Sequence, residues 1–68
     1  MLPDPLEILW DHLLSRQPAK IRQAFNALDE AGRRATLAHL RRMVTEPDWH
    51  PEQRKSARAA LEALDQRA

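Results

Sequence analysis

The clearest helical segment of the sequence is residues 4–14, DPLEILWDHLL. Asp4 is suited to cap a helix, and Pro5 falls at the first helical position, where its missing N–H costs nothing. Apolar residues then recur at the spacing of one helix face, at Leu6, Leu9, Trp10, Leu13 and Leu14. We therefore predict an amphipathic helix that begins at Pro5 and buries this stripe.

Prolines punctuate the rest of the chain in the same way. Pro18 opens a second segment, Pro47 stops a third, and Pro51 opens a fourth. The only glycine, Gly32, falls either in the second connection or in the first turn of the third helix, and Asp29 is a plausible cap there. The predicted helices span about 5–15, 18–29, 31–45 and 51–66.

Connections this short place consecutive helices against each other as αα-hairpins. The sequence therefore predicts a single all-α domain over residues 1–68, a small four-helix domain built from two αα-hairpins. Trp49, in the last turn, is expected to fold over the alanine-rich fourth helix, and Met43 to lie at the edge of its stripe. The predicted core consists of Leu6, Leu9, Trp10, Leu13, Leu14, Ile21, Phe25, Leu28, Leu37, Leu40, Val44, Leu61 and Leu64.

The second predicted hairpin carries a pattern of its own across residues 37–64. An apolar helix is followed by a turn with Pro47 and Asp48, and then by Arg54, Ala57, Ala60, Leu61 and Leu64. This segment resembles a HEAT-type helical unit, although Gln53 stands where such units usually have an aliphatic residue. The resemblance implies two antiparallel packed helices and carries no function.

Composition excludes several classes of protein. The 68 residues contain no cysteine, so neither a disulfide framework nor a thiolate metal site is expected. No stretch approaches the ~18 apolar residues of a membrane span, and residues 1–5 do not resemble the start of a signal peptide. We therefore expect a cytoplasmic protein without a membrane segment.

The chemistry-bearing residues form no catalytic motif. His12, His39 and His50 have no metal-ligand spacing; His12 and His39 are expected on polar faces, and His50 at a helix start. One glycine cannot build a phosphate-binding loop, and no serine has the glycine-flanked surroundings of a nucleophile. We expect no enzyme, cofactor, metal site or small-molecule ligand.

Positive charge is concentrated in the middle of the chain. Residues 16–45 carry seven lysines or arginines and two acidic residues, whereas residues 1–15 carry three acidic residues and no lysine or arginine. A nucleic-acid-binding accessory protein is therefore the alternative function, although the net charge of only +1 speaks against it. Its candidate residues are Lys20, Arg22, Arg33, Arg34, Arg41 and Arg42.

The first helix also carries an apolar residue away from its stripe. Ile8 lies roughly 160–200° around the helix from the stripe, so it should face away from the core. Asp11 and His12 are predicted on the same outer face. The preferred function is a non-catalytic interaction or regulatory module that binds a protein partner or forms a homo-oligomer through Ile8, Asp11 and His12.

Overall fold

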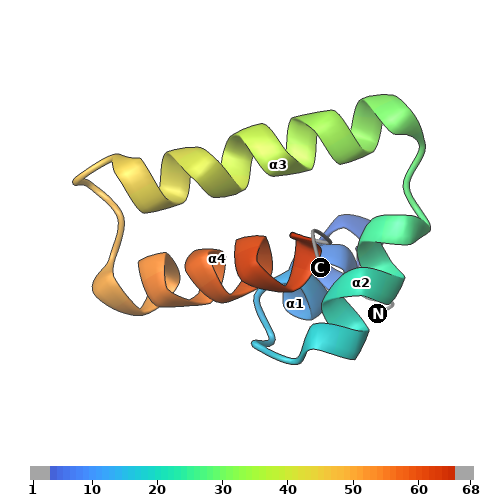
Figure 1. Cartoon of the computed structure of the whole chain (residues 1–68), viewed down its shortest axis with the longest axis horizontal. Helices are drawn as coiled ribbons and strands as arrows, with labels where there is room; N and C mark the ends of the chain where they lie inside the picture. The colour runs from blue at the N-terminus through green and yellow to red at the C-terminus, as the bar shows by residue number, and fades with distance from the viewer. Residues whose placement is uncertain (1–3, 66–68) are drawn as a thin grey trace.

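A computed structural model of the chain describes residues 4–65. Within this range the chain forms four α-helices and no strand, which confirms the predicted all-α class (Figure 1). The helices are α1 (Pro5–Leu13), α2 (Pro18–Asn26), α3 (Glu30–Thr45) and α4 (Pro51–Leu64). None of the helices in residues 4–65 has both the length and the apolar character needed to cross a membrane.

Side chains cap the starts of α1 and α3 as the sequence predicts. Asp4 Oδ1 accepts a hydrogen bond from the backbone N–H of Leu6 at 2.9 Å. Asp29 Oδ1 accepts one from the N–H of Gly32 at 2.7 Å, so Gly32 lies inside the first turn of α3. Each bond satisfies an N–H group that has no partner within its own helix.

His50 caps α4, in agreement with its predicted place at a helix start. Its Nδ1 accepts from the N–H of Glu52 at 3.3 Å, and its own N–H donates to Gln53 Oε1 at 3.3 Å. This reciprocal pairing is a capping box with histidine in the position that serine or threonine usually takes.

The first two helices end earlier than predicted. α1 stops at Leu13 rather than near residue 15, because Arg16 takes a left-handed backbone conformation with a φ of 62°. α2 stops at Asn26 rather than near 29, because Asp29 has to adopt the extended backbone of an N-cap for α3. α4 ends at Leu64, and the predicted end at 66 lies outside the described residues.

The four helices of residues 4–65 form two hairpins that meet through α2 and α4. α3 and α4 run antiparallel, as the resemblance of residues 37–64 to a HEAT-type unit implies, and α1 packs against α2 (Figure 1). α2 also packs against α4 and so joins the hairpins. The resulting molecule is flattened, with principal extents of 35 × 32 × 22 Å.

The core lies where these hairpins meet. Leu13, Ile21 and Leu40 are fully buried, as predicted. They pack with Met43 of α3 and with three alanines, Ala24 of α2 and Ala57 and Ala60 of α4, whose small side chains allow the helices to approach closely. The other predicted core residues are half-buried, except for Leu6.

Two core predictions are wrong. Met43, expected at the edge of its stripe, is only 2% exposed because α4 presents alanines that leave room for its long side chain. Leu6, expected in the core, is 60% exposed. It lies in the first turn of α1. Periodicity predicts the direction of its side chain, but only the packing of the whole chain shows that this part of α1 is left uncovered.

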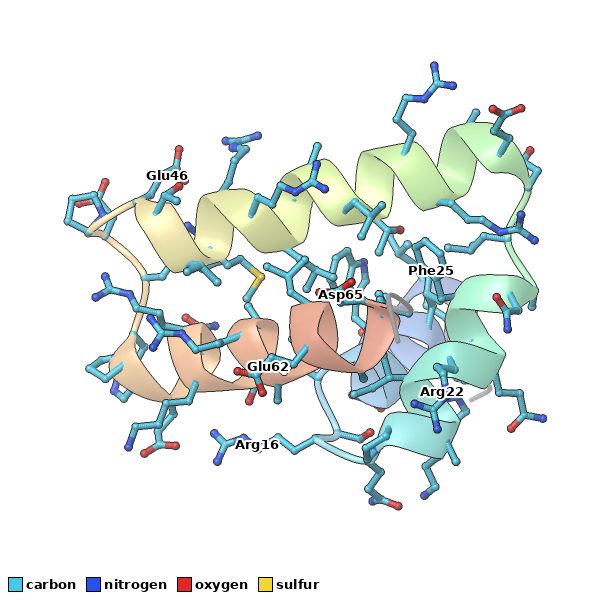
Figure 2. All side chains as sticks on the ribbon, viewed as in Figure 1. Arg16, Arg22, Phe25, Glu46, Glu62 and Asp65 are labelled. Carbon is cyan, nitrogen blue, oxygen red and sulfur yellow. The ribbon has the colours of Figure 1, made fainter. Side chains whose placement is uncertain are left out.

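Arg16 links the α1–α2 turn to α4 (Figure 2). Its Nε donates to Ser56 Oγ at 3.0 Å, and its Nη2 donates to the carbonyl oxygen of Glu52 at 3.1 Å and to Glu52 Oε2 at 2.8 Å. These bonds satisfy the buried Ser56 hydroxyl and hold the two hairpins together.

Candidate functional site

An open apolar groove runs between α1 and α2. It has a volume of about 560 Å³. We call it the α1–α2 groove, and its walls are formed by Asp4, Pro5, Leu6, Ile8, Leu9, His12, Ala24, Ala27 and Leu28. Most of these side chains are apolar, and charged or polar groups are found only at Asp4 and His12.

The shape of the groove follows from unequal side chains on its two walls. α1 contributes the long side chains of Leu6, Ile8 and Leu9, whereas the other wall combines the methyl groups of Ala24 and Ala27 with the single long side chain of Leu28. Leu6 is 60% exposed and Ile8 is 41% exposed, and they are the large hydrophobic residues most exposed in residues 4–65. Exposed apolar side chains that gather around one apolar groove are typical of interaction surfaces.

A second hollow of about 450 Å³ continues this surface across α1 toward α3. It shares Leu6, Leu9 and Leu28 with the α1–α2 groove. Its remaining walls are Trp10, Gly32, Ala35, Thr36 and His39. Leu6 therefore stands between two adjoining hollows, and the apolar surface extends over three helices.

His39 does not lie on a polar face, as the sequence suggested, but is half-buried between two tryptophans. Its ring is 4.9 Å from the Trp10 ring and 5.5 Å from the Trp49 ring, both in edge-on geometry. The cluster connects α1, α3 and the turn before α4. Periodicity on α3 could not reveal this, because the two rings that cover His39 come from other parts of the chain.

Trp49 also fixes a carboxylate at the end of α3. Its indole N–H donates to Glu46 Oε1 at 3.0 Å. This hydrogen bond, together with the positive charge of Arg42 at 3.5 Å, holds the pKa of Glu46 below its usual value of 4.5. The indole thus serves as packing surface and hydrogen-bond donor at once, which is typical of half-buried tryptophan.

Glu52 is a second carboxylate held in its charged form. The hydrogen bond from Arg16, and then the positive charge of Lys55, lower the pKa of Glu52 from its usual 4.5. Both Glu46 and Glu52 lie at the ends of helices outside the α1–α2 groove. We therefore interpret them as structural groups.

The structure brings together two of the three residues predicted to bind a partner. Ile8 and His12 line the α1–α2 groove, and both are exposed. Asp11 is exposed as well, but it does not line either hollow. Sequence reasoning missed Ala24, Ala27 and Leu28 on the opposite wall, since only the packing of α2 on α1 makes them part of this surface.

The six basic residues of the nucleic-acid alternative do not all project freely from the surface. Arg33 donates to the carbonyl oxygens of Phe25 and Asn26 and so caps the end of α2. Arg34 pairs with Glu30 at 3.2 Å, and Arg42 pairs with Glu46. The other three are exposed and form no ion pair with a described residue: Lys20, Arg22 (Figure 2) and Arg41.

Among residues 4–65, no group of three or more histidine or acidic side chains is placed to hold a metal ion. The three histidines lie in different places: His12 in the α1–α2 groove, His39 between the tryptophans and His50 at the start of α4. Comparison with known proteins adds no relative, because no protein-family model, curated protein or solved structure matches the chain.

Proposed function

We propose that this chain is a non-catalytic interaction module that binds protein through the α1–α2 groove. The observation that carries the proposal is the exposure of two large apolar side chains, Leu6 and Ile8, which both line one open apolar groove. Full burial of one such side chain contributes about 1.5–3 kcal/mol. Leu6 is 60% and Ile8 is 41% exposed, so a partner that covers them gains only part of this amount from each, and the rest of the binding free energy must come from the other residues of the groove.

Protein binding is preferred to nucleic-acid binding because three of the six candidate basic residues already serve the fold. Arg33 caps α2, and Arg34 and Arg42 form ion pairs along α3. Nucleic-acid binding stays a prediction, and a mobility-shift experiment with generic duplex DNA tests it. Affinity that falls by orders of magnitude between low and moderate salt would favour it over apolar binding.

We also propose a cytoplasmic location, since a chain without cysteine gains nothing from an oxidising compartment. Fractionation of cells that produce the untagged chain tests this. Recovery in a membrane or secreted fraction would contradict it.

Photo-crosslinking in the native cells tests the binding proposal. A benzophenone amino acid is placed at position 8, in the α1–α2 groove, and in a matched control at position 38, which is exposed in α3 and lines neither hollow. We expect a discrete protein adduct at position 8 that position 38 does not give. Equal labelling at both positions, or none at either, would contradict the proposed function.

A further inference from the structure

We propose that the occupant of the α1–α2 groove is a second copy of this chain, with the two α1 helices antiparallel and Ile8 at the twofold axis. This inference rests on the proposed function and names its partner. It follows from the order of three exposed side chains along α1 and from the hydrogen-bonding capacity that they leave open.

Asp4, Ile8 and His12 are spaced four residues apart, so they follow one row along α1, from its N-cap to its last turn. Rows of this kind form the ridges that pack into the grooves of a neighbouring helix. The ridge lies at the wall of the α1–α2 groove, to which all three residues contribute. Each copy therefore offers a ridge and an adjoining groove, the self-complementary arrangement that a twofold interface requires.

An antiparallel pairing about Ile8 brings residues that are equally distant from it along the helix opposite each other. Asp4 of one copy then faces His12 of the other, on both sides of the axis, and Ile8 faces Ile8. Glu7 faces Leu9, and Asp11 faces Pro5, so no carboxylate lies directly opposite another. A parallel pairing would instead set each of these carboxylates against its own copy, which is unfavourable.

The polar groups at both ends of the ridge can form further hydrogen bonds. Asp4 Oδ1 accepts from the N–H of Leu6, whereas Oδ2 receives no hydrogen bond from a described residue. The His12 ring forms no side-chain hydrogen bond within residues 4–65, although its carbonyl oxygen accepts from Ser15. A hydrogen bond from the His12 ring of one copy to Asp4 Oδ2 of the other satisfies both groups and leaves the N-cap of α1 intact.

The floor of the groove suits this occupant. Beside Leu28, Ala24 and Ala27 provide only methyl groups to the wall across from α1, so this part of the groove leaves space for an aliphatic side chain from a second molecule. Ile8 of the other copy is such a side chain, and it is 41% exposed in the single chain. Dimer formation covers Ile8 of both copies at once.

Sedimentation equilibrium of the purified chain at moderate salt tests the inference. We expect a monomer–dimer equilibrium in the wild type and at least a tenfold weaker dimer in Ile8→Asp. Ala38→Asp is the matched control, which places the same charge at an exposed position of α3 outside both hollows, and it should dimerise as the wild type does. Circular dichroism establishes that each variant is folded.

Charge variants test the antiparallel pairing itself. His12→Glu sets a carboxylate against Asp4 of the other copy and should weaken the dimer, whereas His12→Lys should not. Asp4→Asn keeps a good helix cap and removes the repulsion, so the double variant Asp4→Asn with His12→Glu should dimerise better than His12→Glu alone. Equal dimerisation of His12→Glu and His12→Lys would overturn the proposed register.

A cysteine at the axis provides a geometric test, because the chain has no cysteine of its own. Under mild oxidation, Ile8→Cys should form a disulfide-linked dimer faster than Ala38→Cys. A wild type that is monomeric at every concentration would overturn the self-association. The proposed function would then stand if position 8 still crosslinked to a different protein, and it would fall if no adduct formed.

Discussion

Arg16, in the turn between α1 and α2, has a left-handed backbone conformation with a φ of 62°, which residues other than glycine rarely adopt. The strain is offset by its hydrogen bonds to Ser56 and Glu52. Arg16→Ala loses the bonds and keeps the strain, whereas Arg16→Gly loses both. We therefore expect Arg16→Gly to be more stable than Arg16→Ala by about 1 kcal/mol, and both to be less stable than the wild type. Urea denaturation measures this, and equal stability of the two variants would mean that the turn stores no strain.

Leu6 and Leu40 allow a direct comparison of a surface leucine with a core leucine. Leu40 is fully buried, so Leu40→Ala should lower the free energy of unfolding by about 2–5 kcal/mol. Leu6 is 60% exposed, and Leu6→Ala should cost less than about 1 kcal/mol at a concentration where the chain is monomeric. Chemical denaturation of both variants provides the measurement. A cost at Leu6 as large as that at Leu40 would show that Leu6 belongs to the core, as its place in the stripe first suggested.

One end of α3 and one end of α4 depend on charged carboxylates. The pKa values of Glu46 and Glu52 are lower in the folded chain than their usual 4.5, so the folded state binds fewer protons than the unfolded state as the pH falls past that value. The stability that these groups contribute at neutral pH is therefore lost below about pH 4.5. The double variant Glu46→Gln with Glu52→Gln should be less stable at neutral pH and show a flatter loss of stability in acid. An unchanged acid limb in urea titrations would contradict this reading of both carboxylates.

The starts of the helices follow from the sequence more closely than their ends or their burial do. Helix starts are local events: Asp4 and Asp29 cap the helices they were expected to cap, and His50 lies at the start of α4 as expected. Helix ends and burial depend on distant residues. The end of α1 depends on Arg16 binding α4, and the burial of Met43 depends on alanines of α4. Ile8 and His12 could be selected from α1 alone, whereas Ala24 and Ala27 enter the site only through packing.

The whole molecule is flat and its core is thin, with the buried side chains confined to the region where the two hairpins meet. Small domains of this size gain stability by oligomerisation. If the second copy covers the α1–α2 groove, dimer formation stabilises the folded state by mass action. The melting temperature of the wild type should then rise with protein concentration, whereas that of Ile8→Asp should not. Differential scanning calorimetry over a hundredfold range of concentration measures this, and parallel behaviour of the two proteins would count against a folded dimer.

If this chain binds a second copy through the α1–α2 groove, the amide chemical shifts of labelled protein change at the groove as the protein is diluted. We predict concentration-dependent shifts that cluster at α1 and at Ala24, Ala27 and Leu28 on the other wall of the groove, and their loss in Ile8→Asp. Shifts centred on the basic residues of α3, or none at any concentration, would contradict the claim.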